Sequence, residues 1–420
     1  MSATMTKNSR PEGAPNFALL ALLLSACSMP MPMPDAGRGR GYDGGITDRF
    51  PVLPNAKATK VVVGATFACA LTTTQTVRCW GASGQTSDPT RPFGFLGSAV
   101  DFPRVPMPID VPDLNGVIDI DASVSHVCVV LGNGSVSCWG ANDWAKLGVE
   151  LPEDGGVRIG DRFTPQTVNG VSGATKVVTG ERHTCALLSS GGVKCWGGDF
   201  NSQLLNQSTE NMRSGRPLDM PGITGATELA AYASQTCAAV PTGVKCWGQG
   251  PVNGSTEAMA PFTVPLTGVT GLAINRTANC AIAAGAAKCW GQTDQGLLGN
   301  GSDTGELEPR MPVQVSGATQ GVTSITRQCA VISGAVKCWG RDGRYLGNGT
   351  DKGSALPVDV LAVSGATQVS SNIEVSCAVA NGGQVWCWGD NLHGAVGNGI
   401  DVVESGLRYF STPQRVLSFE

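Results

Sequence analysis

The sequence predicts an all-β protein assembled from seven similar units. The triplet Cys-Trp-Gly occurs seven times between residues 79 and 389, and successive copies begin 43 to 59 residues apart. Fourteen of the 15 cysteines form seven pairs whose members lie nine or ten residues apart. No unit keeps a helical period. Each contains four short apolar runs separated by turns, which is the strand content of a propeller blade.

Unit three shows the order of the elements. Residues 174–180 and 184–188 form two apolar runs, and a Gly-bearing turn leads to a third run at 193–197. A polar loop and a proline-containing fourth run complete a unit, as at 311–315. We expect residues 411–419 to supply the last outer strand, beside a blade that starts near residue 50, so that the ring closes.

The spacing of the paired cysteines predicts one disulfide across the central hairpin of each unit. The midpoint of each pair falls on a two- or three-residue turn, and directly opposed hairpin residues lie within disulfide reach. The turn at 73–75 is the weakest case because it lacks glycine. The predicted bridges are Cys69–Cys79, Cys128–Cys138, Cys185–Cys195, Cys237–Cys246, Cys280–Cys289, Cys329–Cys338 and Cys377–Cys387.

The tryptophan and glycine of each triplet are expected to be architectural. An indole after the bridged cysteine supplies apolar area for packing between neighbouring blades, and the following glycine permits a tight exit from the strand. Seven equivalent copies favour this interpretation over a functional row of tryptophans.

The N-terminus predicts export and lipidation. Residues 1–26 combine Lys7 and Arg10 with a short apolar core at 17–24, which is typical of a signal peptide and too short to span a bilayer. The core ends in Leu-Ser-Ala-Cys, which resembles a bacterial lipobox, so Cys27 is the predicted lipidation site. Residues 27–49 are rich in Pro and Gly and form a tether, and residues 50–420 form the repeat domain. Seven disulfides suit the same oxidising compartment, and Ser28 after the cysteine favours the outer membrane.

The repeats resemble the regulator-of-chromosome-condensation repeat. The residues that carry the resemblance are 183–187 with 193–197, 389–391 with 394–399, and 298–301. The resemblance covers about residues 50–420 and implies a seven-bladed β-propeller. The eukaryotic founder of the family is a nuclear exchange factor for a small GTPase, and it also binds chromatin. The export signal, the lipid anchor and the disulfides depart from that founder, and no exchange-catalysing residue can be carried over. Secreted bacterial relatives include a propeller that inhibits β-lactamases by binding over them, which favours protein binding.

Composition and motifs argue against several other classes. The chain has 15% charged residues, 41% hydrophobic residues and a net charge of −4, so a coiled coil, wholesale disorder and a nucleic-acid partner are not expected. We find no catalytic or phosphate-binding motif and no metal or cofactor set, and predict a non-enzyme. His126 and His183 share a slot that elsewhere accepts Phe67, Gln235 or Arg327, which indicates a structural role. His393 lies in a more exposed loop without a catalytic partner.

Long loops with aromatic residues are the best functional signal. The loops after the hairpins of units one and two are expanded, those of units three and seven are long as well, and the loop of unit four is the shortest. The loops of units seven, one, two and three carry most of the loop aromatics. Loops on a rigid scaffold concentrate binding residues, although such rings can also pack their own loops. The candidate binding rim is Phe93, Phe95, Phe102, Trp144, Phe163, Phe200, Tyr409 and Phe410.

We therefore expect a monomeric binding propeller on the bacterial envelope, attached to the membrane only through its lipid. Its expected partner is another protein. Envelope carbohydrate is the alternative, and it would need planar exposed rings near Asn or Asp. A hydrolase with a site in the central channel is a third hypothesis. It would need convergent acidic or histidine groups on the innermost strands, which the sequence barely offers.

Overall fold

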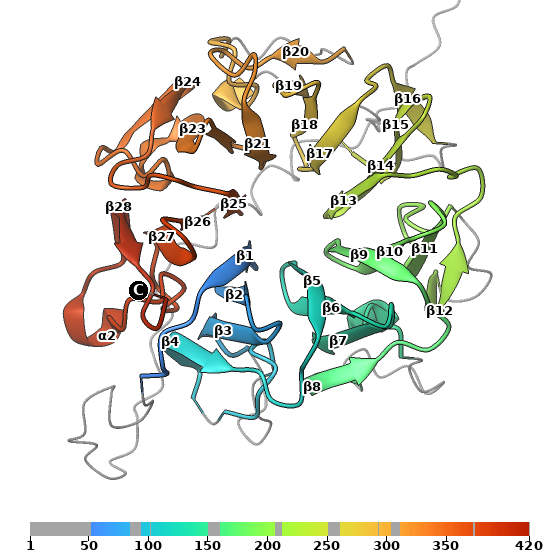
Figure 1. The fold of residues 1–420 in the computed structure, drawn as a ribbon, viewed down its shortest axis with the longest axis horizontal. Coiled ribbons are helices and arrows are strands. Elements are labelled where there is room, and N and C mark those ends of the chain that lie inside the picture. The colour runs from blue at the N-terminus through green and yellow to red at the C-terminus, as the bar shows by residue number, and fades with distance from the viewer. Residues whose placement is uncertain are drawn as a thin grey trace, which may run out of the picture. The chain divides into compact units, whose positions relative to one another are not determined.

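The described strands form seven four-stranded antiparallel sheets placed around a central axis (Figure 1). The computed structural model describes residues 52–84, 94–100, 102–149, 160–205, 212–250, 261–292, 294–303, 311–372 and 374–419. Each sheet is one blade, made of four strands that are consecutive in the sequence and run outward from the axis. The predicted all-β fold, with seven four-stranded propeller blades, is confirmed.

The blades are numbered 1 to 7 in chain order. Blades 1 to 3 contain β1 (Ala58–Val63), β2 (Phe67–Thr72), β3 (Val77–Ala82), β4 (Arg104–Asp110), β5 (Val117–Ala122), β6 (His126–Leu131), β7 (Val136–Gly140), β8 (Arg162–Thr167), β9 (Ala174–Thr179), β10 (His183–Leu188), β11 (Val193–Gly198) and β12 (Arg213–Asp219). Blades 4 and 5 contain β13 (Glu228–Tyr232), β14 (Ser234–Val240), β15 (Gly243–Gln249), β16 (Phe262–Val264), β17 (Val269–Ala273), β18 (Ala278–Ala283), β19 (Ala286–Gly291) and β20 (Val313–Gln314). Blades 6 and 7 contain β21 (Val322–Ile325), β22 (Cys329–Ile332), β23 (Ala335–Asp342), β24 (Lys352–Asp359), β25 (Gln368–Ser371), β26 (Val375–Ala380), β27 (Gln384–Asp390) and β28 (Tyr409–Arg415). Short helical turns are η1 (Asp143–Ala145), η2 (Asp294–Gly296), η3 (Gly343–Tyr345) and α2 (Val402–Ser405).

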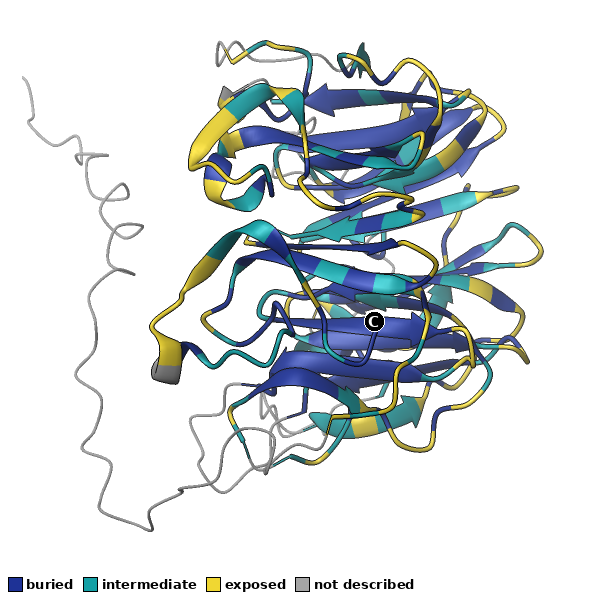
Figure 2. Cartoon of the chain, turned by 60° about the vertical axis from the view of Figure 1, so that its left-hand side comes forward, coloured by how far each residue is buried: buried dark blue, intermediate teal, exposed yellow. Residues whose placement is uncertain are grey.

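The second and third strands of each blade are buried almost throughout, because both faces of a middle sheet are covered by the neighbouring blades. In blade 1 every residue of β2 and β3 is buried, whereas exposed residues collect in the outer strands and loops (Figure 2). The apolar residues gather in clusters that combine two adjacent blades. The core of the protein is therefore a ring of interfaces between blades. Within the described residues, no helix is long and apolar enough to cross a membrane.

All seven predicted disulfides are present, one in each blade. The paired cysteines oppose each other directly in the ladder between the second and third strands, for example Cys185 and Cys195. Their Cα atoms lie 4.0 to 4.1 Å apart in every bridge. The glycine-free turn of blade 1 forms with Gln75 at φ 60°, and hydroxyl groups of the neighbouring threonines bond across it. Short hairpins thus set the cysteine register.

The seven triplet tryptophans pack between blades, as predicted, and are all buried. Six indole N–H groups donate to a backbone carbonyl in the third-to-fourth-strand loop of the preceding blade, at 2.9 to 3.1 Å. Trp196, for example, bonds to the carbonyl oxygen of Lys146. The Nε1 atom of Trp290 has no such partner within the described residues. Each of these six bonds connects a blade to a loop of the preceding blade.

The ring closes by contacts between blades 7 and 1. Blade 1 is complete from β1 to β4, and β28 is the outer strand of blade 7, as expected for this segment. The amide of Ala56 donates to the carbonyl of Ser418 at 2.9 Å, and Gln368 exchanges bonds with the backbone of Val61. No strand is shared between the described ends of the chain, because each blade takes its four strands from one continuous segment.

Candidate functional site

Two features that could bind a partner lie on the same face of the propeller. In an antiparallel blade, the connection between strands one and two and the connection between strands three and four emerge on one side. We call this side the upper face. The first feature is a cavity in the central channel, and the second is a group of aromatic and basic side chains toward the rim of blades 2 and 3.

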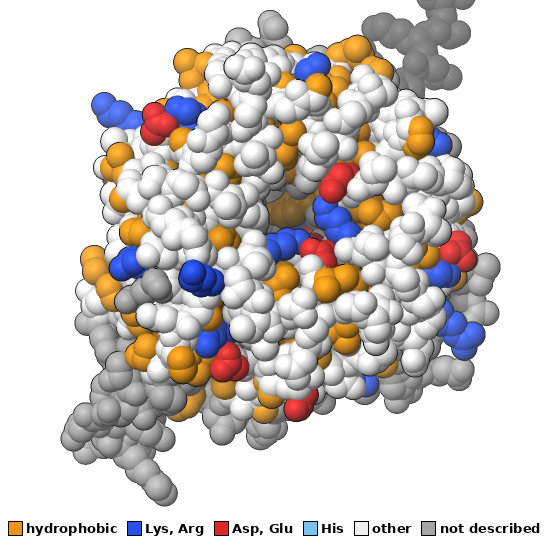
Figure 3. All heavy atoms as spheres, in the orientation of Figure 1, with side chains coloured by type: hydrophobic (Ala, Val, Ile, Leu, Met, Phe, Trp, Pro, Cys, Tyr) orange, Lys and Arg blue, Asp and Glu red, His pale blue; other side chains and the backbone are white. Residues whose placement is uncertain are grey.

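The channel carries more charge than the sequence analysis predicted. Four charged residues occupy equivalent positions on the innermost strands, nine residues before the first cysteine of the hairpin: Lys60, Asp119, Lys176 and Glu228. Basic and acidic side chains surround an opening at the centre of the face in Figure 3. The expectation that the innermost strands barely offer acidic groups was therefore wrong. The sequence did contain a signal for these channel charges, because a charged residue interrupts the first apolar run in each of units one to four.

These charged groups are matched to one another. The Lys60 ammonium lies 2.7 Å from a carboxylate oxygen of Asp119, and Lys176 pairs with Glu228. The second oxygen of Asp119 accepts a bond from the amide of Val177 in the next blade at 3.0 Å. Because each pair joins neighbouring blades, the charges at this level hold the ring together and leave no free acid–base couple.

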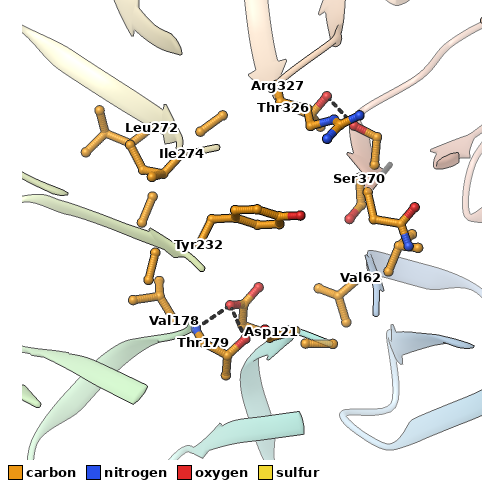
Figure 4. A pocket seen from close by; sticks show the side chains of 18 of the residues that line it. Val62, Asp121, Val178, Thr179, Tyr232, Leu272, Ile274, Thr326, Arg327 and Ser370 are labelled. Carbon is orange, nitrogen blue, oxygen red and sulfur yellow. Dashed lines mark hydrogen bonds between the residues drawn. The ribbon is translucent and has the colours of Figure 1, made fainter. Parts of the chain in front are cut away.

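The channel contains a cavity of about 500 Å³, and Lys60, Lys176 and Glu228 are among the residues that line it. One wall is apolar and includes Val178, Leu272 and Ile274, and Tyr232 extends from β13 into the middle (Figure 4). Asp121 accepts bonds at 2.7 and 2.8 Å from the backbone amide and hydroxyl of Thr179. Burial raises the pKa of the Asp121 carboxyl, against the lowering effect of Lys60.

The histidine slot is structural, as predicted, in blades 2 and 3. Nε2 of His126 lies 2.9 Å from the Thr184 hydroxyl, and Nε2 of His183 lies 2.7 Å from the Thr236 hydroxyl. Both rings are fully buried between blades, and burial lowers both pKa values, that of His183 to about 4. His393 is half-buried, and burial lowers its pKa as well.

On the rim, the structure brings Trp144 and Phe200 together from the loops of blades 2 and 3. Their ring centroids lie 5.8 Å apart in an edge-to-face arrangement, and the Arg182 guanidinium lies over the Trp144 ring at 5.3 Å from its centroid. Phe200 is 56% exposed, and Met212, 53% exposed, accepts a backbone bond from the neighbouring Asp199. We call Trp144, Arg182, Phe200 and Met212 the rim patch. The sequence analysis missed Arg182 and Met212, which carry no motif.

The other described members of the predicted rim do not join this patch. Phe95 is half-buried and packs 5.6 Å from Phe67, and Phe163 packs over Gly94. Phe102 and Phe410 are half-buried, the latter against the core of blade 7, and Tyr409 beside it is 41% exposed. Phe93 and the lipidation site Cys27 lie outside the described residues. Several of these rings therefore pack against the propeller, and Phe200 is the most exposed described member of the predicted rim.

The described residues contain no group of three or more His, Cys, Asp or Glu side chains arranged to hold a metal ion. The two charge pairs of the channel and the bonded carboxylate of Asp121 do not form a nucleophile, base and oxyanion arrangement. The upper face thus offers surfaces for binding.

Comparison with known proteins identifies the repeats. Residues 58–85 and 174–203 match one family model described as regulator of chromosome condensation (RCC1) repeat, and residues 133–187 match a second model with the same description. The mouse protein described as "Probable E3 ubiquitin-protein ligase HERC4" is 25% identical over 224 residues, covering 50% of this chain and 20% of that protein. The fission yeast (Schizosaccharomyces pombe) "Protein pim1" is 26% identical over 210 residues, covering 45% of this chain and 36% of that protein. The chain thus spans about a fifth to a third of the length of these relatives.

A solved structure agrees at the level of the fold. Human WBSCR16 aligns with a TM-score of 0.52 and 17% sequence identity, covering 87% of this chain and 83% of that one. This likeness, together with the repeat matches, shows a propeller that carries RCC1 repeats.

Proposed function

Since the chain is a propeller that carries RCC1 repeats, we propose that it is a non-catalytic binding protein whose partner is another protein. The partner docks on the upper face of blades 2 and 3, around the rim patch. The observation that carries the proposal is the edge-to-face pair of half-buried Trp144 and exposed Phe200 beside Arg182. Aromatic residues, Met and Arg are the types enriched in protein interfaces and in their energetic centres.

The conformation of the patch supports a preformed site. Trp144 adopts φ 64°, a left-handed conformation that costs a residue with a large side chain about 1 kcal/mol or more. Arg182 and Gly198 pack directly against the Trp144 side chain. The strained tryptophan is thus fixed before any partner arrives, which lowers the entropic cost of binding.

The same geometry favours protein over carbohydrate. A sugar-binding platform needs an open ring face, but one face of the Trp144 ring lies under Arg182 and the Phe200 ring is edge-to-face with it. Phe200 and Met212 instead present convex apolar surface that would fill a pocket on a partner. Hydrolysis in the channel is not supported, because the acids on the innermost strands, Asp119, Glu228 and Asp121, are engaged by lysines and by Thr179. Nucleotide exchange rests on family analogy alone.

We further propose that the propeller is displayed on the bacterial cell envelope as an outer-membrane lipoprotein. The lipobox ending at Cys27 and the Pro/Gly-rich tether over residues 27–49 support this location. The seven disulfides support an oxidising compartment. A tether of this composition would let the upper face turn toward a partner while the lipid holds the protein at the membrane.

The test is quantitative capture of envelope proteins by the full chain and by two variants. Phe200→Ala removes the exposed ring of the patch, whereas Leu356→Ala removes a side chain of similar exposure, 49%, from the outer strand of blade 6. We expect one or more proteins to be captured by the wild type and by Leu356→Ala, and to fall at least about tenfold with Phe200→Ala. Equal capture by all three forms would contradict the proposed site. Capture of nothing by the wild type would contradict protein binding.

A further inference from the structure

The turn between the first two strands lies closer to the hairpin cysteine in blade 6 than in any other blade. In blade 1 the first cysteine of the hairpin is Cys69, and Leu71, two residues after it, pairs with Lys60. Lys60 therefore lies nine residues before Cys69 in the sequence. The same count holds in blades 2, 3, 4, 5 and 7. In blade 6, Ser324 pairs with Val331, the equivalent position, yet Ser324 lies only five residues before Cys329.

The displaced turn changes what Arg327 does. Counting back from the cysteine puts Arg327 in the slot of Phe67, His126 and His183, which are fully buried between blades. In the structure β22 begins only at Cys329, so Arg327 lies in the tight connection and lines the channel cavity instead. The expectation that this slot is structural in every unit is therefore wrong for Arg327.

Arg327 is half-buried as a whole, and the Nε atom of its guanidinium is completely buried. One of its terminal nitrogens donates to the side-chain carbonyl of Gln328, while its Nε has no partner and no exposed surface. It forms no ion pair within the part of the chain that the structure describes. Burial lowers its pKa to about 10. A buried charge that is neither paired nor fully hydrogen-bonded is costly, so proteins rarely keep one without a use.

The rest of the cavity leaves this charge unbalanced. Lys60 and Lys176 are neutralised by Asp119 and Glu228, and Asp121 is occupied by Thr179. Glu374 lines the same cavity but forms no ion pair with Arg327, and its carboxyl interacts with the opposite charge of Arg344 and the like charge of Asp390. Leu272 and Ile274 line the cavity from blade 5, the blade next to Arg327, and Tyr232 extends from blade 4 into the middle of the cavity (Figure 4).

We propose that the channel cavity is a binding site for a ligand with one carboxylate and a compact apolar body. The carboxylate binds the Arg327 guanidinium, with the Tyr232 hydroxyl as a second donor, and the apolar body packs on Leu272 and Ile274. A single negative charge fits because a single positive charge is unpaired, whereas a phosphate would meet the acidic groups Asp121 and Glu374. A volume of about 500 Å³ falls in the range of small-molecule sites. Free carboxylic acids and peptide C-termini share this chemistry.

The test is calorimetric titration of the full chain with matched probes. Hexanoate carries both the charge and the apolar body, hexanol lacks the charge, and acetate lacks the body. Acetyl-Gly-Leu with a free or an amidated C-terminus represents a peptide. We expect at least one free-carboxylate probe with an apolar body to bind at least about tenfold more tightly than its uncharged partner, because a charge-assisted bond to a buried arginine is strong. If hexanoate binds, a free carboxylic acid is sufficient as the ligand. If only the peptide with a free C-terminus binds, the ligand is a peptide C-terminus.

Two variants locate the site. Arg327→Gln removes the buried charge, and we expect it to weaken the best probe at least about tenfold while thermal stability is kept or raised. Arg341→Gln makes the same change at an exposed arginine of the same blade, and we expect no effect. Unchanged binding by Arg327→Gln, binding of hexanol as tight as that of hexanoate, or no binding by either free-carboxylate probe would overturn the proposal. Should Arg327→Gln fail to fold, the comparison of hexanoate and peptide with their uncharged partners decides with the wild type alone. Because Phe200 lies outside the cavity, Phe200→Ala leaves this binding intact, and the two proposals fail separately.

Discussion

Mild acid should destabilise the propeller through the two histidines buried between its blades. His183 is fully buried, and its pKa falls from an ordinary 6.5 to about 4 because burial penalises the charged ring. In the unfolded chain the same ring titrates near 6.5. Between pH 6.5 and 4 the unfolded state therefore binds a proton that the folded state does not. Stability is fully present above pH 6.5 and is lost as the pH falls toward 4.

The difference between 6.5 and about 4 corresponds to about 3 kcal/mol of unfolding free energy for His183. Burial lowers the pKa of His126 in the same direction, with Lys146 adding to the effect, so the two losses accumulate. Burial raises the pKa of Asp121, which acts in the opposite sense over part of this range. A comparison of variants is therefore needed to isolate the imidazoles.

The chain itself provides the matched substitution. Gln235 occupies the same slot in blade 4, where its side-chain oxygen accepts a bond from Asn279 at 2.9 Å, just as the histidines bond the next blade. His183→Gln should therefore preserve packing and the bond between blades while removing the titration. The assay is urea unfolding without reductant at pH 7.0, 5.5 and 4.5 for the wild type and for His126→Gln/His183→Gln. We expect the unfolding free energy of both proteins to fall as the pH is lowered, and to fall less in the double variant, so that the difference between the two proteins grows from pH 7.0 to 4.5. Parallel loss of stability in both proteins would refute the reasoning.

Three further predictions concern the joints between blades and the N-terminus. Trp196→Phe removes the donor to the Lys146 carbonyl and should cost about 1–3 kcal/mol more in urea unfolding than Trp290→Phe, whose indole N–H has no partner in the described residues; equal losses would count against the indole bonds. Gly197→Ala should abolish folding as judged by circular dichroism, because a Cβ at φ 106° would lie 2.5 Å from the Arg182 carbonyl oxygen, whereas Gly222→Ala, at φ 73° with open space around it, should cost only about 1 kcal/mol. Cys27→Ser should eliminate labelling by radioactive palmitate in a bacterium that processes lipoproteins, and labelling that persists would contradict the lipobox assignment.

Local sequence signals predicted most of the fold. The disulfides followed from counting, because a short hairpin leaves one register for each cysteine pair, as Cys185 and Cys195 show. The burial of the triplet tryptophans followed from their repetition. The bonds of Trp196 to the Lys146 carbonyl and of His183 to the Thr236 hydroxyl join different units, and no spacing within one unit encodes them.

The candidate sites were harder to predict because they depend on contacts between units. Trp144 and Phe200 lie in different loops, and only the stacking of blades 2 and 3 brings their rings together. Other rim aromatics such as Phe95 turned onto their own blade because nearby apolar surface was available to cover. Arg327 was assigned to the wrong environment because residue counting cannot detect that β21 pairs four residues closer to Cys329 than its equivalents do.

The most direct test of protein binding through the rim patch is site-specific photo-cross-linking in living cells. A photoreactive phenylalanine analogue replaces Phe200 in one form of the full chain and Leu356 in another, and both forms should fold because both positions are exposed. We predict a discrete cross-linked protein from position 200 and none of the same mass from position 356. The same adduct from both positions, or no adduct from position 200, would contradict the proposed binding site.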